Sequence, residues 1–215
     1  HLKKQVLLYL SKLSFPIGFQ FMVEVSAFTI ATIFVGWWKS EELILAHQIA
    51  FNVASISFII ATGLGAAASV KVGYYWGAKD SKMVVSSFRL VILVVIVYML
   101  FCITIMLLTR FTIPTFYTYN AYVIETVATV LIVAAFFQLS DGIQLVCNGA
   151  LRGLNDVNIP MWIAVISYWF ISLPVGYYIA FELDYGLNGI WYGFVAGLSS
   201  SAILLWLRFR YIITR

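Results

Sequence analysis

The sequence predicts an all-α integral membrane protein with six transmembrane helices. Of its 215 residues, 63% are hydrophobic and only 10% are charged, and the mean hydropathy is +0.98. A soluble globular domain carries roughly 25% charged residues. A helix that crosses a bilayer needs about 20 apolar residues, so this length holds about six spans joined by short loops. No soluble domain fits in what remains.

The apolar segments are separated by short runs of charged and turn-forming residues. Tryptophan and tyrosine, whose rings favour the headgroup region, occur at several of their ends. Every segment is at least as long as the hydrocarbon core requires. We expect the spans at residues 13–38, 43–70, 84–108, 122–150, 159–181 and 187–207.

Each of the first three spans has a feature that guides its interpretation. Pro16 falls in the first turn of span one, where proline is tolerated. In span two, the small-residue run GLGAAAS at 63–69 should allow close packing against a neighbouring helix. Span three is rich in β-branched residues, but its 19 uninterrupted apolar or weakly polar residues at 90–108 are too many for a strand. Length therefore favours a helix.

The last three spans contain comparable signals. Span four carries a carboxylate, Asp141, within its apolar sequence. Pro174 lies deep in span five and should kink it, because proline lacks the backbone N–H that a helix interior needs. In span six, Gly189, Gly193 and Gly197 place a small residue at every fourth position, which predicts close packing against a neighbour.

A polar stripe runs along span four. Four residues recur there at steps of three and four, so they share one face of a helix. The turn-forming residues that follow, up to Pro160, predict a helix stop, a short turn and a new helix. The stripe therefore leads from the middle of the membrane to one interface. Its members are Asp141, Gln144, Asn148 and Arg152.

One weak internal repeat is present. Two glycines and an aspartate recur with the same spacing near the ends of spans two and four, where we expect the glycines to stop the helix. The repeat fits the duplicated plan of secondary transporters, and it fits shared capping chemistry equally well. The two copies are Gly73, Gly77 and Asp80, and Gly149, Gly153 and Asp156.

Glu24 and Asp141 are carboxylates embedded deep in their spans. Glu24 lies 12 residues after Lys12, and Asp141 lies 11 residues before Arg152. At 1.5 Å per residue, each is about 16 to 18 Å from the charged end of its span. A carboxylate there costs about 2.5 to 3.5 kcal/mol to insert and usually faces a cavity, an ion pathway or a partner. The pair predicts a shared cation or proton site, or else two protonated carboxyl groups that only join the helices.

Other polar residues could support such a site. Gln20 lies one turn before Glu24, and Gln144 lies one turn after Asp141, so their amide oxygens could complete an oxygen-rich site. Asn148 lies one turn further along the polar stripe and is a candidate cavity residue.

The outer end of span two holds a second polar group, formed by His47, Gln48 and Asn52. These residues are either hydrated groups at the membrane interface or contacts to a ligand. We give them a supporting role.

The sequence does not support an enzyme. One intramembrane histidine without a clustered carboxylate pair forms no zinc site, and there is neither a nucleophile elbow nor a phosphate-binding glycine loop. Cys102 and Cys147 lie in apolar runs and are interpreted as packing residues.

The distribution of cations predicts the orientation of the chain. An even number of spans places both termini on one side, where eleven lysines and arginines fall against two on the other. The positive-inside rule therefore places both termini and the loop at 154–156 in the cytoplasm, and the loop at 39–42 outside. The net charge of +4 then reflects topology and lipid contact, and no nucleic-acid partner is expected. The eleven are Lys3, Lys4, Lys12, Lys71, Lys79, Lys82, Arg89, Arg152, Arg208, Arg210 and Arg215, and the two are Lys39 and Arg110.

Four stretches of the chain resemble the carboxy-terminal six-helix half of multidrug and toxic compound extrusion (MATE) transporters of the NorM-like branch. They are LSFPIGFQFMVEVSAF at 13–28, LAHQIAFNVASISF at 45–58 with GLGAAASVKVGYYWGAKD at 63–80, QLSDGIQLVCNGALRGLNDVNIPM at 138–161, and GLNGIWYGFVAG at 186–197. The resemblance implies a twelve-helix fold with two lobes around a central cavity, of which residues 1–215 are the carboxy-terminal lobe. We therefore expect an amino-terminal lobe upstream of His1.

The resemblance also implies a function. It implies an antiporter of the cell (inner or plasma) membrane that exports cationic amphipathic compounds in exchange for sodium ions or protons, with no further cofactor. The acidic coupling positions of the family fall on Glu24 and Asp141. The chain departs from the family pattern at Phe137, which replaces a frequent tyrosine and offers no oxygen ligand, and at Ala61, which replaces a frequent proline.

Two other classes of protein stay open. A lipid-linked oligosaccharide flippase of the same superfamily should line its cavity with cations for a pyrophosphate headgroup. The midplane charges here are acidic and favour cationic cargo instead. A channel-like or structural membrane subunit is the second alternative, but the sequence has no repeated filter-like loop.

Overall fold

The protein is described by a computed structural model that covers residues 4–214. His1, Lys3 and Arg215, which entered the sequence argument, lie outside the described residues. The described chain is helical, with a short 3₁₀-helix (η1) and two π-helical segments (η2 and η3). The elements are α1 (Lys4–Gly36), α2 (Glu41–Gly77), α3 (Ser81–Leu108), η1 (Ile113–Phe116), α4 (Ala121–Gly153), α5 (Asn158–Val165), η2 (Ile166–Ser172), α6 (Leu173–Tyr177), η3 (Tyr178–Glu182) and α7 (Gly186–Ile213).

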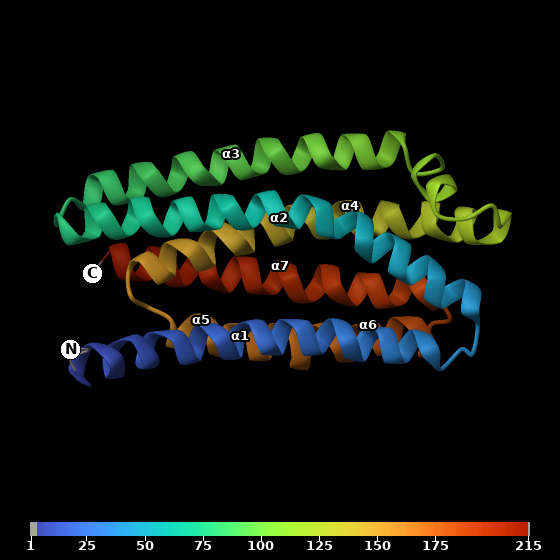
Figure 1. The fold of residues 1–215 in the computed structure, drawn as a ribbon, viewed down its shortest axis with the longest axis horizontal. Coiled ribbons are helices and arrows are strands. Elements are labelled where there is room, and N and C mark those ends of the chain that lie inside the picture. The colour runs from blue at the N-terminus through green and yellow to red at the C-terminus, as the bar shows by residue number, and fades with distance from the viewer. Residues whose placement is uncertain (1–3, 215) are drawn as a thin grey trace.

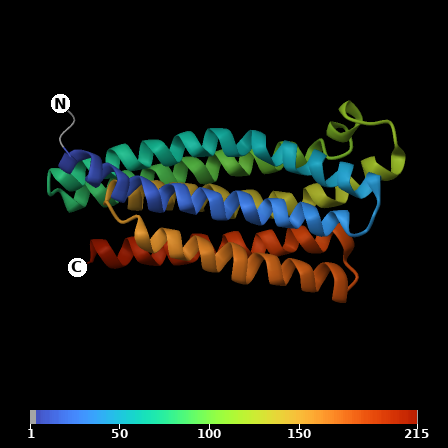
Figure 2. The ribbon, with the colours of Figure 1, turned by 60° about the horizontal axis from the view of Figure 1, so that its bottom comes forward.

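The helices run along one common axis, and both ends of the described chain lie at the same end of the bundle (Figure 1). Within residues 4–214, six helices are long and apolar enough to cross a membrane, which confirms the expected number of spans. Helix α4 is the most deeply buried span and packs against α2, α3 and α7. Figure 2 shows α1 between α2 on one side and the span from α5 to η3 on the other.

The observed helices extend beyond several expected boundaries. Helix α1 begins at Lys4, nine residues before the expected start of span one, because the leucine-rich segment before Lys12 continues the helix. Pro16 therefore lies inside the helix, and its expected placement in a first turn is wrong. Helices α2 and α7 continue to Gly77 and Ile213, past the apolar part of their spans.

Span five changes helix type near Pro174, where the sequence predicts a kink. The span runs from Asn158 to Glu182, and the π-helical segment η2 ends at Ser172, two residues before the proline. The amide of Leu173 bonds to the carbonyl of Tyr168, five residues back, instead of the residue four back. Because Pro174 has no N–H to continue the regular ladder, the wider turn keeps the span intact.

Glycines set the distance between α2 and α4. A Cβ at Gly149 would overlap the carbonyl oxygen of Gly65, and one at Gly153 would meet the carbonyl oxygen of Ser69 at 2.5 Å. Helix α4 continues through Gly149, so the interpretation of that glycine as a helix stop is wrong, but the helix ends at Gly153 and the next one begins at Asn158, as expected. Both glycines also allow close helix packing.

Close packing at the other predicted small-residue series is confirmed. A Cβ at Gly193 or Gly189 of α7 would overlap the backbone of span five, at Gly176 and Ala180 respectively. At Gly197 it would meet the side chain of Ser172 at 2.5 Å. Spans five and six therefore pack so closely that a side chain at Gly189 or Gly193 would not fit between them.

The internal repeat corresponds to two helix ends with the same geometry. Lys79 after α2 and Asn155 after α4 have positive φ angles of 58° and 59°. The next residue, Asp80 or Asp156, donates its amide to the carbonyl five residues back, at 3.0 Å in both cases. This arrangement is a Schellman-type cap, and its left-handed residue is Lys79 or Asn155 instead of one of the repeated glycines. Asp156 also pairs with Arg208 of α7 at 2.7 Å, which fixes the turn to the last helix.

Candidate functional site

Glu24 of α1 and Asp141 of α4 line the same cavity. The cavity has a volume of about 220 Å³ and is otherwise mostly apolar, with Phe28, Phe51 and Phe137 among its walls. Glu24 is 7% exposed and Asp141 is 3% exposed, so both carboxylates are nearly removed from solvent. The structure thus brings together the two deep carboxylates that the sequence singled out.

Glu24 is held by a hydrogen-bond chain from two other spans. The Tyr168 hydroxyl of η2 donates to Glu24 Oε1 at 2.9 Å, and Gln144 Nε2 of α4 donates to that hydroxyl oxygen at 2.9 Å. Gln144 therefore does not line the cavity beside Asp141, as the sequence suggested, but supports Glu24 through Tyr168. All three side chains are buried.

Asp141 has fewer hydrogen-bond partners than Glu24. Within residues 4–214, no hydrogen-bond donor reaches its carboxylate, and Asp141 lines the same cavity as Glu24. A buried carboxylate without a donor or a cationic partner is strongly destabilised in its ionised form. The described residues contain no cluster of three or more His, Cys, Asp or Glu side chains, so a cation here would rest on this carboxylate pair.

Gln20 has a different partner from the one expected. Its Oε1 accepts a hydrogen bond from Arg152 Nη2 at 3.5 Å, and the guanidinium also lies 5.0 Å from the ring centroid of Phe21. Gln20 thus links α1 to α4 on the side of Glu24 nearer the chain ends, instead of completing an oxygen site. Arg152 and Asn148 line a neighbouring cavity of about 310 Å³ that shares Phe21 with the carboxylate cavity.

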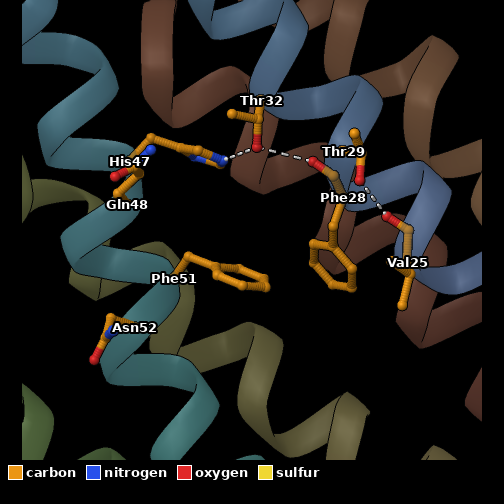
Figure 3. A pocket seen from close by; sticks show the side chains of 8 residues that line it. All are labelled: Val25, Phe28, Thr29, Thr32, His47, Gln48, Phe51 and Asn52. Carbon is orange, nitrogen blue, oxygen red and sulfur yellow. Dashed lines mark hydrogen bonds between the residues drawn. The ribbon is translucent and has the colours of Figure 1, made fainter.

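A third cavity, of about 420 Å³, lies toward the opposite end between α1 and α2. Gln48 and Asn52 line it, and it shares Phe28 and Phe51 with the carboxylate cavity (Figure 3). The carboxylate cavity therefore neighbours the other two cavities, with which it shares wall residues.

His47 lies at the wall of this third cavity but is not hydrated. Its side chain is 2% exposed, and its Nε2 lies 3.2 Å from the Thr32 hydroxyl (Figure 3). Its ring also contacts Trp191 edge-on. The interpretation of His47 as an interfacial hydrated group is wrong, because its ring is enclosed by Thr32 of α1 and Trp191 of α7. Asn52 accepts a hydrogen bond from the Tyr117 hydroxyl at 3.2 Å.

The family model described as MatE matches residues 16–178 of this chain. The chain belongs to the MATE family. It is 37% identical over 92% of its length to the multidrug resistance protein NorM of Burkholderia vietnamiensis, and 34% identical over 96% to a probable NorM of Xylella fastidiosa. It covers 44% of the length of each of these relatives.

Solved MATE structures share this fold. An outward-facing multidrug resistance MATE transporter matches all of the chain with a TM-score of 0.92 at 14% identity, and the match covers 48% of that protein. The eukaryotic MATE transporter AtDTX14 matches 92% of the chain with a TM-score of 0.84 at 19% identity. The described residues thus have the fold of one six-helix lobe of a MATE transporter.

Phe137, where this MATE chain departs from the expected tyrosine, has an aromatic role. It is 6% exposed, and its ring contacts Phe28, Trp191 and Phe194. It supplies no oxygen to the site.

The one hydroxyl bonded to a cavity carboxylate in the described structure comes from Tyr168, which sequence reasoning missed. The signal for Tyr168 was its position two turns before Pro174 in a span with few polar groups.

Proposed function

We propose that this chain is the carboxy-terminal half of a cation-coupled antiporter that exports cationic, amphipathic compounds by alternating access. The observation that carries the proposal is the pair of buried carboxylates, Glu24 and Asp141, on the wall of an aromatic cavity. The relatives of the chain are named multidrug resistance proteins, which supports cationic, amphipathic compounds as the exported substrates.

The coupling follows from electrostatics. Two carboxylates in a cavity of low dielectric constant cannot both stay ionised without a counter-charge, so the cavity holds a proton, a sodium ion or a cationic substrate. A substrate cation and the coupling ion then compete for the same charges. Competition of this kind is sufficient for exchange when the cavity opens alternately to the two sides of the membrane.

The polarity of the cavity also argues against a flippase for anionic lipid-linked cargo. A transporter of the same superfamily from Pyrococcus furiosus shares this fold with a TM-score of 0.80 at 18% identity, and is described as having a binding pocket of reverse polarity that suggests a different function. Among the described residues, no cationic side chain lines the carboxylate cavity, and Arg152 lines the neighbouring cavity.

Transport by a reconstituted full-length protein tests this function. A sodium gradient and a proton gradient, each directed into the vesicle, are imposed in separate experiments. In one of the two, a fluorescent organic cation should leave the lumen against its own concentration gradient. Substrate movement that follows neither gradient would contradict the proposal.

We expect the 215 residues alone to export nothing. Cavities of secondary transporters form between two repeats, and this chain spans about 44% of the length of its relatives. Expression of residues 1–215 in a drug-sensitive host should give no resistance, whereas coexpression with the expected amino-terminal lobe should restore it. Clear efflux by the fragment alone would indicate a dimer or another kind of transporter.

We also propose that both ends of this segment face the cytoplasm. Single cysteines at Ser81 and Thr112, which are exposed at opposite ends of the bundle, test this orientation in a background without other cysteines. An impermeant thiol reagent added to intact cells should label the cysteine at 112 and spare the one at 81. The reverse pattern would show that the orientation is wrong.

A further inference from the structure

Tyr168 is a buried polar residue at the carboxylate site that the proposed exchange does not yet use. Its side chain is fully buried, and its hydroxyl lies between Gln144 Nε2 and Glu24 Oε1 at 2.9 Å from each. The three residues belong to α4, η2 and α1. Because Gln144 donates to the hydroxyl oxygen, the hydroxyl proton is directed to Glu24.

This contact occupies one of the two Glu24 oxygens. The other oxygen has no hydrogen-bond donor within residues 4–214, and Glu24 lines the cavity. One oxygen is therefore held by the protein and the other remains available to an ion.

Tyr168 lies in the π-helical segment of span five. Tyr168 is the third residue of η2, and its carbonyl accepts the amide of Leu173 across the wider turn before Pro174. A π-turn shifts the following side chains around the helix axis relative to a regular α-helix, and such turns are frequent at functional sites.

We propose that Tyr168 is a positioning residue that allows Glu24 to release its coupling ion, an inference that rests on the proposed function. A hydrogen bond to an ionised carboxylate is roughly twice as strong as one to a neutral group. The Tyr168 hydroxyl therefore stabilises the ion-free, negatively charged Glu24 more than the neutralised, ion-bound one. Without this donor, Glu24 holds a proton or a sodium ion more tightly.

Ion-dependent efflux by the full-length protein tests this role. Tyr168→Phe removes the hydroxyl and keeps the ring, so the apparent KM for the coupling ion should fall about tenfold, and kcat should fall because release is slower. Gln144→Met, which leaves the hydroxyl in place but removes its orienting donor, should shift KM in the same direction by less. Tyr178→Phe, in the same span but 56% exposed, is the matched control and should change neither value.

The outcomes separate this inference from the proposed function. If Tyr168→Phe has a lower kcat but an unchanged or higher KM for the ion, Tyr168 does not promote ion release. If Tyr168→Phe does not fold, an unchanged KM for the ion in Gln144→Met would contradict the same role. If Glu24→Gln retains normal ion-driven efflux, the proposed function itself fails. If Glu24→Gln loses ion dependence while Tyr168→Phe keeps the ordinary KM, only the role of Tyr168 fails.

Discussion

Glu24→Gln and Asp141→Asn should each reduce ion-driven efflux by the full-length protein to background without preventing folding. Each amide keeps the shape of its carboxyl group, but it removes the charge that binds the coupling ion. Glu24→Gln also retains an oxygen that can accept from the Tyr168 hydroxyl. The measurement is substrate efflux from vesicles under imposed sodium and proton gradients.

Glu125→Gln is the matched control for these variants. Glu125 is an exposed carboxylate on α4, the same helix as Asp141, and its neutralisation should leave efflux unchanged. If the two deep carboxyls only join helices in their neutral form, the amides should substitute well. Near-normal efflux with both changes present would therefore contradict the coupling role.

Gly149→Ala should have the largest effect on folding. The added Cβ would overlap the carbonyl oxygen of Gly65, so α2 and α4 must move apart beside the cavity that Arg152 lines. Overpacking against backbone cannot be relieved by a side-chain rotation, and we expect a loss of about 3 kcal/mol or more of stability. The melting temperature and the yield of folded protein in detergent should both fall.

Gly63→Ala is the same chemical change at a position with open space around it. No atom lies within 4 Å of a Cβ placed at Gly63 on α2, so only the intrinsic preference of alanine for helix remains. This variant should be as stable as the parent or slightly more stable. Equal melting temperatures for Gly149→Ala and the parent would show that α2 and α4 do not pack as described.

The membrane spans and the deep carboxylates could be predicted because each depends on local sequence. A run of about 20 apolar residues needs no tertiary contact to identify a span, and one charge within it has few structural explanations. Periodicity placed Asp141 and Gln144 on the same side of a helix, and depth placed Glu24 at the level of Asp141. The small residues of α7 likewise indicated close packing.

The partners across the site could not be predicted, because they depend on how the helices are rotated and how they approach one another. The same glycine can stop a helix or admit a neighbour, and only the position of α2 shows that Gly149 does the second. Gln20 turns to Arg152 rather than to the carboxylates, and Tyr168 reaches Glu24 from a π-helical turn that no periodicity reveals.

The most direct test of the carboxylate site is the release of coupling ions when substrate binds to the purified full-length protein. Addition of an organic cation in unbuffered solution should release protons, or should displace radioactive sodium if sodium is the coupling ion. The double variant Glu24→Gln/Asp141→Asn should release neither. Ion release by the double variant at the level of the parent protein would contradict the assignment of Glu24 and Asp141 as the coupling site.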